Sequence, residues 1–290
     1  MTTPPSQPIP TPTATEDWLL LLLGDSALPT GGFVASGGLE AAKQAGHVSD
    51  ATQLRGFMRD AVHTYAFGGV PIVREAWGVM AGEGEGEGRG EREKIVELDG
   101  DHDTLIGTNH VARKASRAQG AAFLTLLMRG FPSERGVEIV KAFKTEVRAS
   151  RSPGHLAVCF GIVCWSLGIS LERTEHLFLF LHVRSLLSAA IRLNLVGPYQ
   201  GQQMLLAAQA DVAEVLRLVR EKMELDEQQG GKYDRHDSTD DGMTGGVVEN
   251  EDDADLRHHR LATTTACQTS PVVDILQGLH SQLYSRMFNS

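Results

Sequence analysis

Apolar side chains recur at helical spacing along most of this 290-residue chain. No run of alternating polar and apolar residues rich in Val, Ile and Thr, of the kind that marks a strand, is present. Near the carboxyl end, Ser270 and Pro271 form a helix start. The apolar residues that follow fall at i, i+3, i+4, i+7 and i+11 on one helix face: Val272, Ile275, Leu276, Leu279 and Leu283. The pattern predicts an all-α fold.

The expected helices are separated by Gly, Pro or Ser. Segment 177–195 is apolar on nearly all sides, and we expect it to be the central helix. In segment 104–129 the inward stripe contains small residues, which would let a neighbouring helix come close. We expect a single compact, bundle-like domain of roughly eight to ten helices, with others near 50–65, 71–80, 134–147, 154–167, 202–224 and 270 onward.

Two acidic segments interrupt the helical pattern. The chain has 27 Lys and Arg against 37 Asp and Glu, a net charge of −10. Residues 82–103 hold nine acids and three bases, and residues 224–255 hold twelve acids and two bases. Such polar, Gly-rich, self-repelling segments cannot bury enough apolar area to offset chain entropy. We predict disordered insertions at 82–103 and 224–259 within one domain of residues 18–290, after a Pro/Thr-rich tail at 1–17. The remaining body is mildly basic.

The cysteine count and the amino-terminal segment indicate a cytoplasmic protein. Three cysteines are too few for a disulfide framework, and their number is odd. Residues 1–15 contain no Lys or Arg, unlike a signal or transit peptide. The longest uncharged apolar stretch, 156–169, is shorter than the roughly 20 residues that a membrane-spanning helix needs.

Motifs of catalysis and cofactor binding are absent from the sequence. No Walker A motif occurs, and the carboxylates of GEGEGEG at 82–88 would repel a phosphate. The Gly-x-Ser-x-Gly motif of hydrolases is not formed around Ser36, because Val34 occupies the position of its first Gly. Cys159 and Cys164 have a poor spacing for binding one ion from one helix face. The sequence predicts a protein without catalysis, cofactor or resident metal.

Two alternatives remain open at this stage. A helical enzyme could act on a small molecule through the polar side chains near 198–203. Direct binding of a divalent metal ion could involve the adjacent His258 and His259 beside the second acidic segment, although adjacent residues point in different directions on a helix.

Two segments have the composition of protein contacts. The run ALPTGGF at 27–33, with one Pro and two Gly, predicts a sharp turn before a new helix that starts near 36–40. The terminal run LYSRMFNS at 283–290 contains two aromatic residues, Met and Arg, which are enriched at protein–protein contacts. We predict that this tail binds a partner protein. The alternative is that it folds back on its own body.

Four blocks of the sequence together resemble the UreF family of urease accessory proteins. They are LLLGDSALPTGGFVASGGLEAAKQAG (21–46), ARKASRAQGAAFLTLL (112–127), AAIRLNLVGPYQGQQMLL (189–206) and SPVVDILQGLHSQLYSRMFNS (270–290). The resemblance implies an all-helical, often dimeric chaperone without catalysis of its own. It also implies that the protein bridges a UreD/UreH-type accessory protein and a UreG-type GTPase during GTP-dependent nickel insertion into apo-urease.

The resemblance also assigns candidate partner-binding residues. The usual Ser and aromatic residue after the Phe of the turn are replaced here by Val34 and Ala35. The residues carried over are Pro29, Gly31, Phe33, Ser36 and Glu40 in the first block, Arg113 and Gln119 in the second, Pro198 and Gln203 in the third, and His280, Tyr284, Ser285, Arg286 and Phe288 in the tail.

Overall fold

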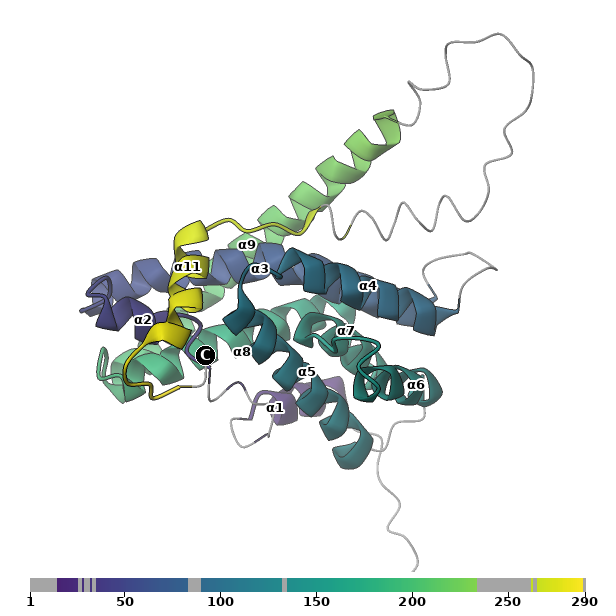
Figure 1. Cartoon of the computed structure of the whole chain (residues 1–290), viewed down its shortest axis with the longest axis horizontal. Coiled ribbons are helices and arrows are strands. Elements are labelled where there is room, and N and C mark those ends of the chain that lie inside the picture. The colour runs from purple at the N-terminus through teal and green to yellow at the C-terminus, as the bar shows by residue number, and fades with distance from the viewer. Residues whose placement is uncertain are drawn as a thin grey trace, which may run out of the picture.

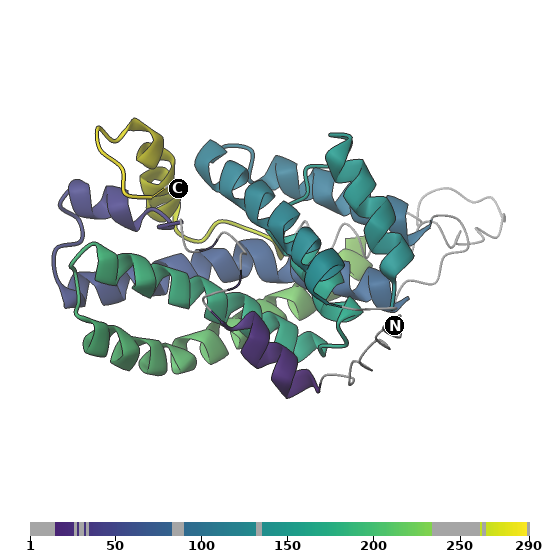
Figure 2. The same cartoon turned by 90° about the horizontal axis from the view of Figure 1, so that it is seen from below.

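In its described part, the computed structural model contains ten α-helices and no strand, which confirms the all-α prediction. It describes residues 15–25, 28, 32, 35–82, 90–131, 135–233, 262 and 265–288. Figures 1 and 2 show the helices packed as one bundle-like body. The elements are α1 (Glu16–Leu23), α2 (Leu39–Gln44), α3 (Ala51–Ala81), α4 (Glu91–Leu105), α5 (His110–Gly130), α6 (Val137–Arg148), α7 (Leu156–Ser166), α8 (Leu171–Arg192), α9 (Pro198–Tyr233), α11 (Pro271–Leu279) and the 3₁₀ turn η2 (His280–Gln282).

Helix α3 runs along the body and contacts α4, α7, α8 and α9 (Figure 1). Asp50 caps its first turn by accepting hydrogen bonds from the backbone N–H groups of Thr52 and Gln53. The prediction of separate helices at 50–65 and 71–80 is wrong, because α3 passes through Pro71 without a break. Pro71 removes one backbone hydrogen bond, but its side chain is buried in the core, and this tertiary packing offsets the loss.

The most enclosed helix is α7, and not segment 177–195 as expected. Nine of its eleven residues are buried, since α3, α5, α6, α4 and α8 surround it. Helix α8, which covers most of 177–195, leaves Phe180 39% exposed. Close packing against α3 depends on Gly161, where a Cβ would lie 2.5 Å from the Val73 carbonyl oxygen. Gly120 allows α5 to come equally close to the segment just before α7. A Cβ added to Gly120 would lie 2.2 Å from the carbonyl oxygen of Gly154.

Helix α4 corrects the prediction of a disordered insertion at 82–103. It covers Glu91–Leu105, while residues 83–89 lie outside the described part. Ile95 and Leu98 are fully buried, and Asp99 and His102 lie on the same inward stripe. This i, i+3, i+4, i+7 pattern is present in the sequence, but the high charge of the segment masked it. Similarly, α9 continues to Tyr233, beyond the predicted start of the second insertion at 224, whereas 234–261 lie outside the described residues.

Asp99 attaches α4 to the start of α7. Its carboxylate accepts hydrogen bonds from the Ser152 hydroxyl, the Gly154 N–H at 2.5 Å and the His155 N–H at 2.8 Å. These contacts satisfy backbone donors at the amino end of α7 that have no partner within the helix. The acidic residue is therefore a structural cap.

A second polar chain joins α4, α5 and α7. The Ser116 hydroxyl lies 3.1 Å from His155 Nδ1, and His155 Nε2 lies 2.8 Å from Asp103. The Ser116 hydroxyl oxygen accepts a hydrogen bond from the Leu156 N–H, so the hydroxyl proton is free to be donated to His155 Nδ1. In this tautomer His155 donates from Nε2 to the Asp103 carboxylate. Hydrogen bonds from Arg113 hold the pKa of Asp103 at about 2, and burial lowers the pKa of His102 to about 3. The contacts resemble a Ser–His–Asp triad, but the His155 side chain is fully buried.

In the described part of the chain, no helix is both long and apolar enough to cross a membrane.

Candidate protein-interaction surface

Helix α2 begins at a turn that brings α11 against it. Gly37 and Gly38 have φ of +58° and +87°, which glycine adopts without strain. A Cβ on Gly38 would lie 3.0 Å from the backbone nitrogen of Gln277, so the close contact between α2 and α11 also depends on this glycine. Both views in Figures 1 and 2 show the carboxyl-terminal segment beside α2 at one end of the body.

The Glu40 carboxylate binds the carboxyl-terminal tail at three points. It accepts from His280 Nε2 at 2.9 Å, from the Met287 N–H at 2.7 Å and from the Phe288 N–H at 3.2 Å. Glu40 is 2% exposed and His280 1% exposed. A buried carboxylate is stable only when such donors replace water. Glu40 thus fixes the path of a segment that lies about 240 residues further along the chain.

Contacts from α2 and α8 hold the end of the tail. Gln44 Nε2 donates to the Ser285 carbonyl oxygen at 3.0 Å. Phe288 is buried, and the Arg192 guanidinium lies 4.2 Å from the centroid of its ring, a cation–π contact. The alternative that the tail folds back on its own body is therefore correct for His280 and Phe288.

Other side chains of the same segment point away from the body. Tyr284 is fully exposed, Ser285 and Arg286 are exposed, and Met287 is 61% exposed. Helix α11 packs through Val273, Leu276 and His280, so three members of the predicted apolar stripe face outward instead of into the core. We call the outward set the tail surface: Val272, Ile275, Leu279, Tyr284, Arg286 and Met287.

The start of α5 supports α11 through residues that the sequence analysis missed. Asn109 is buried, and its Nδ2 donates to the Asp274 carbonyl oxygen at 3.3 Å and to Gln277 Oε1 at 3.2 Å. Its Oδ1 caps α5 by accepting from the Ala112 N–H at 3.0 Å. Asn is a common residue at the N-cap position of a helix, so the capping role of Asn109 could have been predicted. Nothing in the sequence indicated that its side chain would also bind α11.

The remaining predicted residues do not form one cluster with the tail. Pro29, Gly31 and Phe33 lie outside the described residues. Ser36 is buried, and Arg113 pairs with Asp103. Gln119 lies on α5, and its Oε1 would be 3.7 Å from a Cβ added to Gly32. Pro198 and Gln203 are exposed in the first turns of α9.

A small cavity of about 340 Å³ adjoins the polar residues near 198–203 that the enzyme alternative requires. Gln200 and Gln203 line it, together with apolar side chains of α3 and α9. Its titratable lining residues, in the described part of the chain, are Arg55, Arg59 and Asp211. The cavity therefore lacks a described Ser, Cys or His side chain that could act as a nucleophile.

No group of three or more His, Cys, Asp or Glu side chains suited to a metal ion occurs among the described residues. His258 and His259 lie outside the part that the structure describes.

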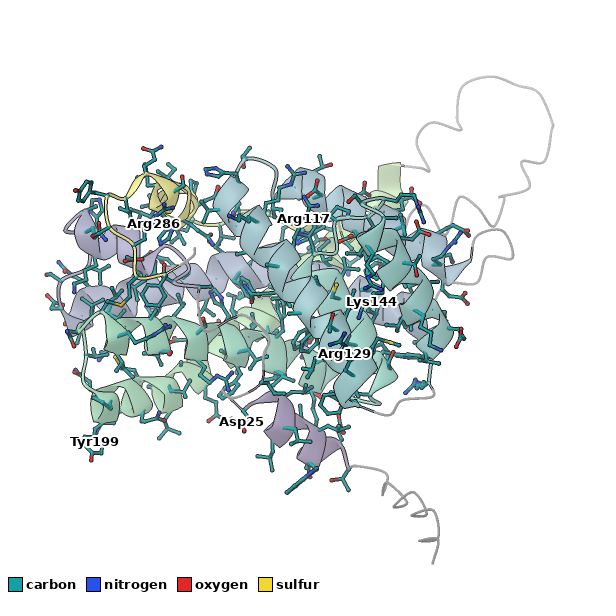
Figure 3. The ribbon with its side chains drawn as sticks, turned by 60° about the horizontal axis from the view of Figure 1, so that its bottom comes forward. Asp25, Arg117, Arg129, Lys144, Tyr199 and Arg286 are labelled. Atoms are coloured by element: carbon teal, nitrogen blue, oxygen red, sulfur yellow. The ribbon has the colours of Figure 1, made fainter. Side chains whose placement is uncertain are left out.

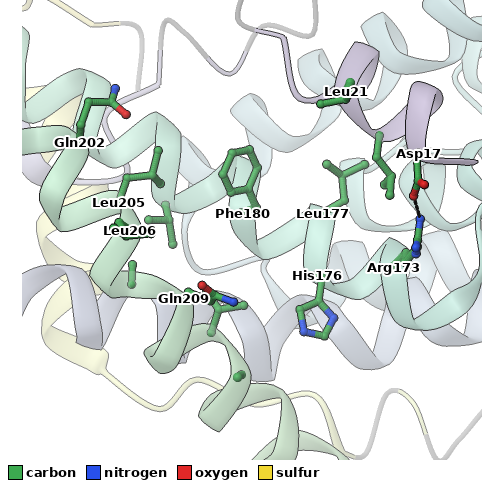
Figure 4. A pocket seen from close by; sticks show the side chains of 15 residues that line it. Asp17, Leu21, Arg173, His176, Leu177, Phe180, Gln202, Leu205, Leu206 and Gln209 are labelled. Atoms are coloured by element: carbon green, nitrogen blue, oxygen red, sulfur yellow. Dashed lines mark hydrogen bonds and ion pairs between the residues drawn. The ribbon is translucent and has the colours of Figure 1, made fainter.

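A larger apolar groove of about 810 Å³ lies between α1, α8 and α9. Figure 4 shows Leu21, Leu177, Phe180, Leu205 and Leu206 around it. Leu21 is 68% and Leu206 74% exposed, so large apolar side chains gather here at the surface. Exposed apolar patches of this kind mark contact sites with other molecules.

Several known proteins that are similar to this chain are named urease accessory proteins. The family model named UreF matches residues 48–209. The "Urease accessory protein 6" of Cryptococcus neoformans var. grubii is 33% identical, over 96% of this chain and 98% of that protein. The "Urease accessory protein F" of Arabidopsis thaliana is 31% identical over 94% of this chain and 91% of its own. A UreF-like protein of Schizosaccharomyces pombe is 28% identical over 97% of this chain and 100% of its own. The chain belongs to the UreF family of urease accessory proteins.

Proposed function

We propose that this protein acts in urease maturation as a non-catalytic adaptor. In this role it bridges a UreD/UreH-type accessory protein and a UreG-type GTPase, and nickel is the cargo that the complex delivers to apo-urease in a GTP-dependent step. Membership of the UreF family supports the role in maturation. One structural observation carries the adaptor role: the tail is fixed by Glu40 in a path that leaves the tail surface facing solvent.

The tail surface has the composition of a binding site. Tyr, Met and Arg bury large areas at modest ordering cost and dominate the energetics of many interfaces. Here Tyr284, Arg286 and Met287 are exposed, and so are the apolar side chains of Ile275 and Leu279 on α11. Because Glu40 already fixes the backbone, little conformational entropy is lost when a partner binds. We assign this surface to the UreD/UreH-type partner.

The groove between α1, α8 and α9 is our candidate for contact with a second copy. It is concave, and the side chains of Leu21 on α1 and Leu206 on α9, 68% and 74% exposed, offer apolar surface at its walls. A twofold-symmetric contact needs such self-complementary surface on one protomer. We therefore propose a homodimer.

We assign the protein to the cytoplasm. Cys159 and Cys164 are buried free thiols, and burial raises the pKa of both. Their neutral, unpaired state is compatible with a reducing compartment.

Deletion of residues 284–290 is expected to abolish co-purification with the UreD/UreH-type partner. Since the deletion also removes the buried Phe288, a second variant, Tyr284→Ala/Arg286→Ala, removes only exposed side chains and keeps the Glu40 contacts. We expect it to weaken partner binding by about 2 kcal/mol or more, the cost of losing an interface hot spot.

The matched control is Leu225→Ala/Arg217→Ala, which removes an exposed apolar residue and an arginine from α9. Its partner binding should equal that of the wild type. Unchanged binding in both tail variants would refute the role of the tail surface.

A further inference from the structure

Four basic side chains lie along the seam between α5 and α6. Figure 3 shows Arg117, Lys144 and Arg129 on one face, and Arg148 lies one helical turn after Lys144. We call these four residues the basic seam. They belong to a chain whose net charge is −10, so the local charge is opposite to that of the whole protein.

Two hydrogen bonds establish how the helices face each other. Lys144 Nζ donates to Thr125 Oγ1 at 3.1 Å, and Arg117 Nε donates to the Pro153 carbonyl oxygen at 3.3 Å. The two helices therefore run antiparallel. Burial lowers the pKa of Lys144, and the neighbouring charges of Arg148 and Arg129 lower it further. Arg129 and Arg148 are thus both close enough to Lys144 to repel its charge.

Within the described residues, none of the four cations of the seam forms an ion pair with a carboxylate. Helix α5 contains no Asp or Glu. On α6, Glu138 pairs with Lys141 at 2.6 Å, and Glu146 pairs with Arg151 at 2.5 Å. The acids nearest in sequence therefore neutralise other cations. The excess positive charge favours binding of an anionic group from outside this surface.

We propose that the basic seam is a docking site for an extended acidic segment of a partner protein. On α6, Lys144 and Arg148 lie four residues apart, about 6.0 Å along the helix axis. In an extended chain, side chains on one face repeat every two residues, about 6.6 Å. A segment with a carboxylate at every second residue therefore matches the spacing of Lys144 and Arg148, and Arg117 and Arg129 on α5 add positive charge beside them. Three of its four residues are Arg, which can pair with carboxylates through two parallel hydrogen bonds.

The surroundings of the seam favour a protein segment over other polyanions. Phe123 and Phe143, the aromatic residues within α5 and α6, are buried, so neither offers a ring on which nucleic acid bases could stack. On α5, small residues such as Ala118 and Ala121 occupy exposed positions between the cations, and they provide little apolar area to insert into a membrane.

This site is separate from the tail surface and goes beyond the proposed adaptor role. Its test is the binding of a fluorescein-labelled peptide of about six Glu-Gly repeats to the full-length protein, measured by fluorescence anisotropy. We expect salt-sensitive binding that Arg129→Glu/Arg148→Glu weakens by about tenfold or more. The control Arg55→Glu/Arg217→Glu makes the same change in net charge on α3 and α9 and should bind like the wild type.

Three results would overturn the proposal: no binding by the wild type, equal binding by both double variants, or stronger binding of heparin or of phosphatidylserine vesicles than of the peptide. If the wild type does not bind, peptide binding after Glu83, Glu85 and Glu87 are changed to Gln would show that the chain's own alternating acids occupy the seam, which equally contradicts a site for a partner protein. Circular dichroism shows whether each variant is folded. Failure here leaves the tail-deletion experiment unaffected, because the two surfaces share no residue.

Discussion

Glu40→Ala is expected to release the carboxyl-terminal tail and to lower the free energy of unfolding by about 2–4 kcal/mol. The substitution removes the acceptor for His280 Nε2 and for the Met287 and Phe288 N–H groups. His280 is 1% exposed, so its ring nitrogen would remain buried without this partner. Urea unfolding measures the loss, and hydrogen exchange of residues 284–288 reports release of the tail.

Two further variants give this experiment its controls. Glu40→Gln keeps the shape of the side chain but replaces one acceptor oxygen by an NH₂ donor, so its effect should be intermediate. Glu221→Ala removes an exposed glutamate that pairs with Arg217 on α9, and it should change stability by less than about 1 kcal/mol. Unchanged exchange at 284–288 in Glu40→Ala would contradict the assignment of Glu40 as the residue that holds the tail.

Gly161→Leu is expected to prevent stable folding, and Gly161→Ala to lower the free energy of unfolding by about 1–3 kcal/mol. A Cβ at this position would meet the Val73 carbonyl oxygen at 2.5 Å and the Trp77 backbone nitrogen at 3.0 Å. These are backbone atoms of α3, so they cannot move aside as a flexible side chain can. The contact lies between the two helices at the centre of the core.

The matched control is Gly56→Ala, also inside a helix but with open space where the Cβ would be. It should raise the unfolding free energy by about 0.5–1 kcal/mol, because alanine is the better helix former. Urea denaturation of the three proteins separates close packing from helix propensity. If Gly161→Ala were as stable as Gly56→Ala, the tight contact between α3 and α7 would be disproved.

Helical periodicity predicted most of the fold because each helix buries a stripe that repeats locally in the sequence. The errors have physical causes. Proline ordinarily ends a helix, but Pro71 is enclosed by packing that only the tertiary structure supplies. The charges of α4 hid a short inward stripe around Ile95 and Leu98. The expected central helix was misplaced since both α7 and α8 are rich in apolar residues, and only their neighbours determine which is enclosed.

The candidate site could be predicted less completely than the fold. The resemblance to the family selected Glu40 and His280, but it gave no reason for them to meet at 2.9 Å. A contact between residues 240 positions apart depends on the path of the whole chain. The same limit applies to Asn109 and Arg192, which stabilise α11 and Phe288. Burial then divided the predicted tail residues into two groups, with Phe288 inward and Tyr284 outward.

The role in urease maturation is tested most directly by urease activity in cells that lack this protein. We expect urease protein to accumulate with little nickel and little activity, and we expect added nickel to restore part of the activity. The gene encoding the wild-type chain should restore full activity, whereas the Tyr284→Ala/Arg286→Ala variant should not. Full urease activity and nickel content in cells without the protein would contradict the proposed function.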